Sequence, residues 1–191
     1  MSIFKVICLV VILAASVNCD FQWGGCPSYK RSMESFEIKK YEGKWFEIAR
    51  EKSTPFQKGD CTTAEYSLNE DGSVKVVNTE TLPNGKRQSA VGNATTTSDP
   101  FRLQVTFSNT FFGKLFKGDY QVVQTDYENY SIVYSCTDLV VARIEYYWIL
   151  SRTNHIESDQ TINYLKLFSD KFNISADKFR FTNQEKDYCG Y

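Results

Sequence analysis

The sequence predicts an all-β protein: an eight-stranded antiparallel up-and-down β-barrel with one C-terminal α-helix packed outside it. Eight β-rich runs follow one another from Gly43 to Arg152 and are broken by turn residues. The expected strands mix apolar, small and polar residues on one face, which suits a hollow barrel better than a dry sandwich core. A single amphipathic helical pattern follows the last strand, and such a helix most simply packs on the outside of the barrel.

Turn residues separate the expected strands. The segments "EDGS" and "PNGK" are the strongest hairpin signals, because Asp-Gly and Asn-Gly accept the positive φ of tight turns. Strands joined in sequence by hairpins form either an up-and-down barrel or a sandwich. The expected strands are residues 44–52, 61–68, 73–81, 86–97, 101–108, 119–125, 130–137 and 144–152.

The composition of the strand faces favours the barrel. In residues 73–81 one face carries Asn78 and Glu80 beside two valines, and in residues 86–97 one face reads alanine, glycine, alanine. A barrel of eight strands is just wide enough to hold one small ligand. Small residues would open that volume, and a few polar groups would orient the guest.

The first expected strand also mixes polar and apolar residues on one face. Residues two apart in a strand share a face, so Trp45, Glu47, Ala49 and Glu51 are expected on one side. Two carboxylates and a tryptophan do not make an ordinary dry core. We therefore expect this strand to be partly solvated or to line a cavity.

The segment "ESDQTINYLKLFSDKF" predicts the helix, and Ser158 with Asp159 offers an N-cap. The following "KFRFTN" is compatible with a short ninth strand. Apolar residues spaced by three and four form one stripe along the helix: Ile162, Leu165, Phe168 and Phe172.

The first 19 residues read as a secretory signal peptide. Lys5 precedes an apolar run over residues 6–15, small residues follow, and we place the cleavage after Cys19. The alternative, a membrane anchor, would need a longer apolar run. We therefore expect residues 1–19 to be removed and residues 20–191 to form one secreted, extracellular domain.

Charge and cysteine content narrow the function classes. The formal net charge is -1 with no basic stripe, which argues against a nucleic-acid partner. Four cysteines remain outside the signal segment, and an even set in a secreted chain predicts two disulfides in one of three pairings. A zinc site needs closely spaced ligands, whereas these cysteines are far apart and the chain has one histidine, so no metal is expected. The four are Cys26, Cys61, Cys136 and Cys189.

Three Asn-x-Ser/Thr sites predict N-glycosylation at Asn93, Asn129 and Asn173 if the chain enters a eukaryotic secretory pathway. Chance occurrence is the alternative for any single site.

Three short segments carry a resemblance to a known family. "GKW" at 43–45, "TDYENY" at 125–130 and "ILSR" at 149–152 resemble, in order and position, the signature segments of the lipocalins. Within that family the chain is most similar to the group with apolipoprotein D, insect bilin-binding protein, insecticyanin and crustacyanin. The matching signature residues are Gly43, Trp45, Thr125, Asp126, Tyr127 and Arg152.

The resemblance implies a structural role for this signature. Trp45 would lie across the closed end of the barrel with Arg152 stacked over its ring, and Gly43 would let the backbone pass close beneath. These residues would form a plug and not a catalytic set. The resemblance also implies two disulfides, Cys26 to Cys136 and Cys61 to Cys189.

The resemblance implies that the protein carries a small hydrophobic ligand in its barrel, with no required cofactor. Biliverdin is the first expectation, while fatty acids, retinoids, steroids and carotenoids stay open. Glu47, one step above the plug, is expected to face the cavity. Strand alternation and the matching positions of bilin-binding relatives indicate the other ligand contacts: Asn78, Ala90, Leu103, Val105, Phe107, Tyr120, Val122, Tyr146 and Trp148.

Two other function classes remain as alternatives. A lipocalin-type isomerase would need a free cavity cysteine, which two disulfides would leave unavailable, and His155 lies in a loop. We therefore expect no catalytic residues and no enzyme activity. The second alternative is a surface-interaction protein. Residues 111–116, with Phe111, Phe112, Leu115 and Phe116, are expected at the barrel mouth, where they would cap the cavity or touch a membrane or lipoprotein surface.

Overall fold

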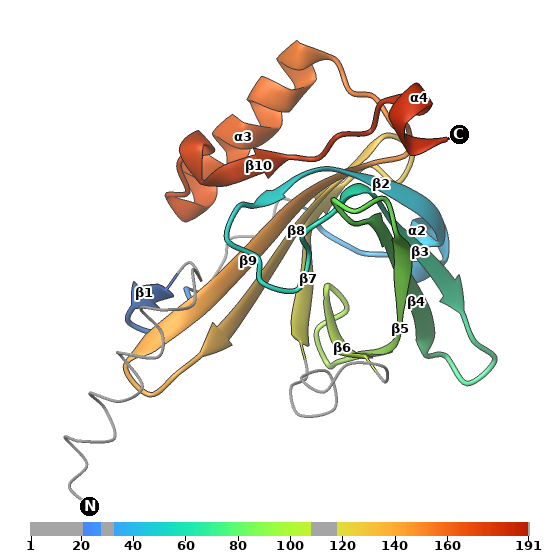
Figure 1. Cartoon of the computed structure of the whole chain (residues 1–191). Helices are drawn as coiled ribbons and strands as arrows, with labels where there is room; N and C mark the ends of the chain where they lie inside the picture. The colour runs from blue at the N-terminus through green and yellow to red at the C-terminus, as the bar shows by residue number, and fades with distance from the viewer. Residues whose placement is uncertain (1–20, 28–32, 108–117, 191) are drawn as a thin grey trace, which may run out of the picture.

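The computed structural model describes residues 21–27, 33–107 and 118–190 (Figure 1). The expected signal peptide and the apolar segment 111–116 lie outside these residues. The elements are β1 (Phe21–Trp23), α2 (Ile38–Tyr41), β2 (Gly43–Glu51), β3 (Asp60–Leu68), β4 (Val74–Thr81), β5 (Arg87–Thr96), β6 (Arg102–Phe107), β7 (Gly118–Thr125), β8 (Tyr130–Asp138), β9 (Ala142–Ser151), α3 (Ser158–Phe172), the 3₁₀ turn η1 (Ala176–Lys178), β10 (Phe179–Phe181) and α4 (Lys186–Cys189).

Strands β2 to β9 form the barrel. Each pairs antiparallel with the next in sequence, and β9 pairs back with β2 to close the sheet. The eight-stranded up-and-down barrel is therefore confirmed, and its strands begin and end within two residues of the expected ranges. Two short strands join the outside of this closed sheet. β1 pairs with β9, and β10, the ninth strand suggested by "KFRFTN", pairs with β2.

A bulge in β2 corrects the expectation for the first strand. Glu47 pairs with Leu150, but Ala49 pairs with the very next residue of β9, so Ile48 is the extra residue. A bulge moves the residues after it to the other face of the sheet. Ala49 therefore packs on the outside of the barrel. Arg50 faces inward, although simple alternation had placed Ala49 and Glu51 on that face.

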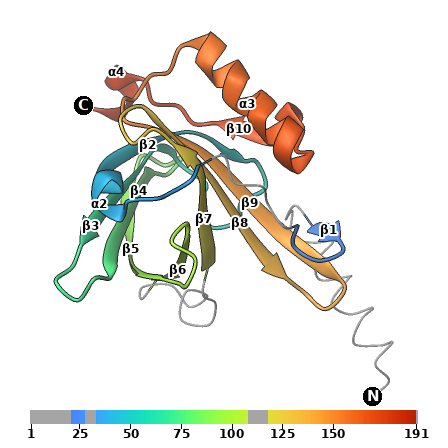
Figure 2. The ribbon, with the colours of Figure 1, turned by 180° about the vertical axis from the view of Figure 1, so that it is seen from behind.

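Helix α3 lies across the outside of the barrel, as predicted (Figures 1 and 2). Phe168 is fully buried there, with its ring 5.5 Å from that of Tyr147 and 5.0 Å from that of Phe179. Two details of the prediction are wrong. Ile162 is 60% exposed, because the helix buries only part of the stripe. Ser158 is the first helical residue and not the cap, since Glu157 holds the extended N-cap position without a side-chain cap bond.

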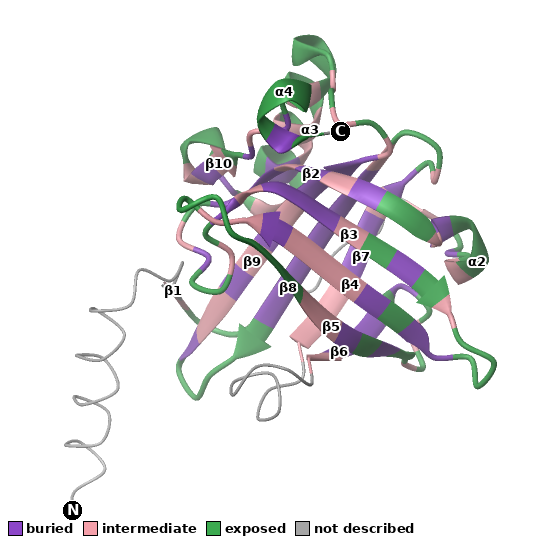
Figure 3. Cartoon of the chain, turned by 45° about the vertical axis from the view of Figure 1, so that its right-hand side comes forward, coloured by how far each residue is buried: buried purple, intermediate pink, exposed green. Residues whose placement is uncertain are grey.

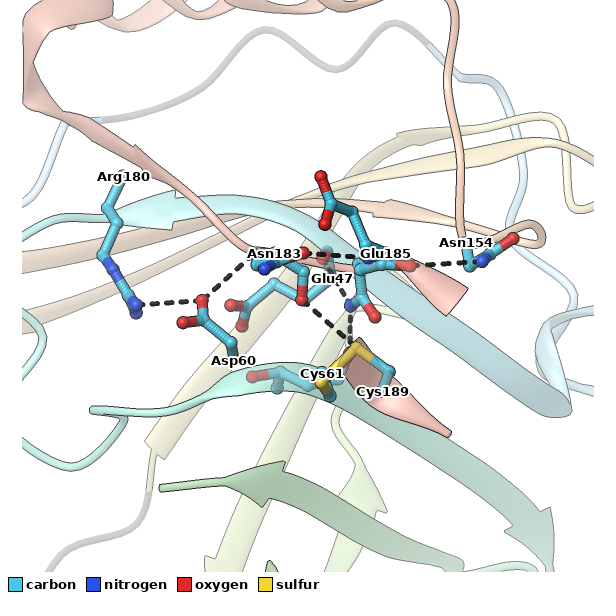
Figure 4. The surroundings of a disulfide bond; sticks show 10 residues. Glu47, Asp60, Cys61, Asn154, Arg180, Asn183, Glu185 and Cys189 are labelled. Carbon is cyan, nitrogen blue, oxygen red and sulfur yellow. Dashed lines mark hydrogen bonds and ion pairs between the residues drawn. A yellow bond between two sulfur atoms is a disulfide. The ribbon is translucent and has the colours of Figure 1, made fainter. Parts of the chain in front are cut away.

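Both expected disulfides are present, Cys26 to Cys136 and Cys61 to Cys189. The second one ties the start of β3 to α4 (Figure 4). The chain between β10 and α4 fills the gap where β2 and β3 separate. The Thr182 N–H donates to Ile48 O, the Cys61 N–H donates to Asn183 O, and both distances are 2.9 Å. The C-terminal tail is therefore part of the barrel wall.

Burial alternates where β3 and β4 approach their shared turn, over residues 65–67 and 74–76 (Figure 3). No helix in the described residues is long and apolar enough to cross a membrane.

Candidate functional site

The ladder register identifies the inner face of the barrel, because directly paired residues share a face. One row runs from Trp45 through Ala64 and Asn78 to Ala90. The remaining pairs extend this face around the barrel, and all ten expected ligand residues lie on it. Leu103, Val105, Val122 and Glu47 are buried, whereas six are only partly buried: Asn78, Ala90, Phe107, Tyr120, Tyr146 and Trp148.

Partial exposure on the inside of a closed barrel has a simple meaning. An inner side chain reaches solvent only through space within the barrel or through its mouth. These six residues therefore line the space inside the barrel or at its mouth, which we call the hollow. Gly92 contributes to its shape, since a Cβ atom there would lie 2.8 Å from the Phe107 ring, which covers the glycine.

The closed end has the plug that the signature implied. The Arg152 guanidinium carbon lies 3.8 Å from the centroid of the Trp45 ring, a cation–π contact. Its N–H groups donate to three backbone oxygens, those of Tyr127 at 2.8 Å, Lys44 at 3.0 Å and Lys40 at 3.1 Å. Gly43 has φ of +92°, a conformation that favours glycine. The arrangement binds the end of β9 to the start of β2 and carries no reactive group.

A chain of four hydroxyl groups lies above the plug, and we call it the hydroxyl chain. Tyr66 and Tyr120 have their oxygens 2.9 Å apart, Tyr120 and Tyr41 3.0 Å, and Tyr41 and Ser131 2.8 Å. Burial raises the pKa of Tyr41 to about 12 and holds the pKa values of Tyr66 and Tyr120 well above the usual value. The three phenols therefore stay neutral hydrogen-bonding groups at physiological pH.

Asn78, on β4, has an unpaired side-chain amide oxygen. Its Oδ1 atom is buried and has no hydrogen-bond partner among the described residues. Its ladder neighbours on both sides, Ala64 and Ala90, are small. A buried amide oxygen without a partner is costly, so a rotation of this side chain that turns the oxygen toward a bound guest and its donor would be favourable.

A second polar cluster lies toward the mouth, and we call it the mouth network. The Glu47 carboxylate accepts from Arg50, from Thr182 and, at 3.0 Å, from the Gln57 side-chain amide. The Gln57 Oε1 atom in turn accepts the Trp148 indole N–H at 2.8 Å. Glu47 is thus occupied by three protein partners, so we leave it out of the proposed ligand contacts.

The mouth network attaches the loop between β2 and β3, residues 52–59, to the barrel. Arg50 donates to the backbone oxygens of Gln57 and Gly59, each at 3.1 Å. Glu80 accepts the backbone N–H groups of Lys58 at 2.9 Å and Gly59 at 2.6 Å. A Cβ atom at Gly59 would lie 2.3 Å from the carbonyl oxygen of Thr81, so only glycine fits this approach.

The structure shows how the other expected residues lie. Tyr146 forms an edge contact with Phe56 of the same loop, at 5.0 Å between ring centroids. His155 is 77% exposed on its side chain, away from the hollow. The three sequon asparagines are all exposed, and their glycosylation stays a prediction. No group of metal-ligating side chains occurs among the described residues.

Sequence reasoning missed several residues of the site: Tyr41, Tyr66, Ser131, Arg50, Phe56 and Gln57. Strand alternation from Ala64 to Tyr66 was a usable signal for one of them. Gln57 and Phe56 lie in a loop, and Arg50 faces inward only because of the bulge, so no pattern in the sequence indicated them.

Comparison with known proteins agrees with this architecture. A family model described as a lipocalin-like domain matches residues 36–184. Apolipoprotein D of Macaca fascicularis is 37% identical over 180 residues, covering 93% of this chain and 92% of that protein. Insecticyanin of the tobacco hornworm Manduca sexta superposes with a TM-score of 0.73 at 27% identity, covering 90% of this chain and 93% of the other. Lobster apocrustacyanin A1 has a TM-score of 0.74 at 22% identity over 87% of this chain and 92% of its own, a likeness of fold alone. The signature plug, the closed barrel with its outer helix and these matches together show that the chain belongs to the lipocalin family.

Proposed function

We propose that this protein is a carrier that binds one small hydrophobic ligand in the hollow of its barrel. The partly exposed inner wall carries the proposal, since a barrel that served only as a scaffold would fill that space with side chains. Aromatic rings with a few polar atoms are the usual lining of such sites. The proposed ligand contacts are Asn78, Ala90, Leu103, Val105, Phe107, Tyr120, Val122, Tyr146 and Trp148.

A linear tetrapyrrole such as biliverdin is the ligand we propose first. Its pyrrole N–H groups suit the unpaired oxygen of Asn78, and its conjugated rings suit Tyr146 and Trp148. The likeness to insecticyanin and apolipoprotein D supports a ligand-carrying role. Lipids, retinoids and carotenoids are the other candidates.

Titration with biliverdin tests both the carrier function and the choice of ligand. We expect saturable quenching of tryptophan fluorescence with a Kd of micromolar or tighter, about -8 kcal/mol. An Ala90→Trp variant should lose this binding because the new ring fills the hollow. Ser89→Trp, one residue away on the outer face, is the matched control and should bind like the parent.

The outcomes separate the ligand from the function. Quenching by retinol or a fatty-acid probe but not by biliverdin would change the ligand and keep the carrier. Binding that Ala90→Trp does not affect, or native material without any bound chromophore or lipid and no binding of any probe, would refute the carrier. The second case would favour a surface-interaction protein.

We also propose that the chain is secreted, with residues 1–19 as its signal peptide. The curated relatives, the paired cysteines and the exposed sequons support this placement. N-terminal sequencing of the native protein would test it, with a start at Asp20 as the expected result. We propose no enzyme activity, since the buried phenols stay neutral, the Glu47 carboxylate is held by three protein partners, and all four cysteines of the described domain are in disulfides.

Contact with a lipid surface is a second proposed property, and one observation favours it. The β8–β9 turn at the mouth exposes Val140 by 99%, beside Leu139 and Val141. Trp23, which pairs next to this turn, is 68% exposed, and Phe56 on the other mouth loop is 58% exposed. Apolar tips around the entrance of a hydrophobic site suit a membrane or lipoprotein surface from which the ligand enters.

Vesicle co-sedimentation tests this contact. Changing Leu139 and Val140 together to Ser should reduce the bound fraction, while Ile162→Ser removes an exposed apolar residue from α3 and should not. Equal binding by both variants would contradict the proposal. The expected contact through residues 111–116 is tested separately by changing Phe112 and Leu115 together to Ser.

A further inference from the structure

The hydroxyl chain holds more hydrogen-bond donors than it uses. Four hydroxyl groups carry one proton each, and three links join them. Every link consumes one proton, so one proton is left over however the donors are arranged. Within the described part of the chain these hydroxyls have no further hydrogen-bond partner.

Burial decides where the surplus proton is best placed. Tyr41 and Ser131 are fully buried and Tyr66 is 4% exposed, so a surplus proton on any of them would be a buried donor without a partner. Tyr120 alone is partly exposed to the hollow. If its oxygen accepts from Tyr66 and from Tyr41, and Tyr41 accepts from Ser131, every buried hydroxyl donates and Tyr120 keeps its proton.

We propose that Tyr120 donates this proton to a neutral hydrogen-bond acceptor, a carbonyl or hydroxyl oxygen, on the ligand in the hollow. This inference rests on the proposed carrier function and narrows its ligand class. Tyr120 is a binding residue in this assignment, and Tyr41 and Ser131 are positioning residues, because their two links already leave the surplus proton on Tyr120.

The charges on the inner face exclude an anionic group at this depth. In the described barrel only three inner positions are charged, and they are Glu47, Arg50 and Glu80. Arg50, the single cation among them, is already paired with Glu47. A ligand carboxylate beside Tyr120 would therefore be desolvated with one neutral donor and no counter-ion, which is costly. Such a ligand is expected to keep its carboxylate at the mouth.

Three retinoids that share one polyene skeleton show whether the site beside Tyr120 prefers a neutral acceptor, an anionic group or no polar group. All-trans-retinol ends in a neutral hydroxyl, retinoic acid in a carboxylate, and axerophthene in a hydrocarbon. We expect the parent protein to bind retinol roughly threefold to tenfold more tightly than the other two, the range for one net hydrogen bond. Tryptophan fluorescence quenching gives the three Kd values.

Two variants test the assignment to Tyr120. Tyr120→Phe removes the donor, so retinol should lose this advantage while axerophthene binding stays unchanged. Tyr66→Phe is the matched control, because three hydroxyls with two links still leave one surplus proton, and Tyr120 still keeps it. This variant should retain the preference for retinol. Circular dichroism verifies that both variants are folded.

Each contrary result has a definite meaning. Equal loss in both variants, tighter binding of retinoic acid than of retinol, or no saturable binding of any retinoid to the parent would overturn the assignment. The carrier proposal fails on different evidence, namely the absence of any bound hydrophobic compound and the lack of effect of Ala90→Trp.

Discussion

Replacing Trp45 with alanine removes the central part of the plug at the closed end of the barrel. The indole is fully buried, donates its N–H to the Tyr41 carbonyl at 2.9 Å and lies under the Arg152 guanidinium. The ring buries up to ~250 Å², which at ~25 cal/mol per Å² sets an upper limit of about 6 kcal/mol. Partial collapse around the site reduces this, so we expect a loss of about 3–5 kcal/mol in the free energy of unfolding.

Urea unfolding of the oxidised protein measures this loss. With a slope of about 2 kcal/mol per molar urea, the midpoint should fall by roughly 2 M. Trp23→Ala is the matched control, because the same atoms are removed from a side chain that is 68% exposed, and its midpoint should stay close to that of the parent. Arg152→Ala should lower the midpoint too, since it uncovers the indole and frees three backbone oxygens.

The result that would refute the reasoning is an unchanged midpoint for Trp45→Ala, or a fall no larger than that of Trp23→Ala. Either outcome would mean that the plug does not hold the closed end together.

Three other predictions concern the disulfide, the mouth and the phenols. Changing Cys61 and Cys189 together to Ser should cost about 4 kcal/mol of unfolding free energy, because the bond closes a loop with a sequence separation of 128; an unchanged thermal midpoint would contradict this. Gln57→Ala should speed ligand exchange in stopped-flow measurements, because it removes the contacts of the mouth loop with Glu47 and Trp148. Gln104→Ala, on the exposed outer face, should leave the exchange rate unchanged, and equal rates in the two variants would show that the loop is no barrier. Burial raises the pKa of Tyr41 to about 12, above the ordinary tyrosine value of about 10. The folded protein therefore keeps the Tyr41 proton longer than the unfolded chain, and the free energy of unfolding should fall by roughly 1.4 kcal/mol per pH unit between pH 10 and 12. Spectroscopic titration that finds every phenol ionising near pH 10 in the folded protein would refute this burial effect.

Several features of the protein follow from the sequence alone. Alternating strand patterns and hairpin turns such as "PNGK" are local signals, and they determined the number, order and approximate ends of the barrel strands. Alternation also placed Asn78, Tyr120 and Trp148 on the inner face, since a regular strand has a period of two. The family signature supplied the plug and the cysteine pairing, which spacing by itself left open between three arrangements.

The tertiary structure decided the chemistry inside the barrel. A bulge of one residue in β2 turned Arg50 inward to meet Glu47, and no local preference announces where such a bulge will form. The mouth network and the hydroxyl chain join residues separated by as many as 135 positions, through contacts that only the closed barrel brings together. Sequence periodicity reports which face a side chain lies on. Which side chains then meet across the hollow depends on strand register and barrel closure, and those are properties of the whole fold.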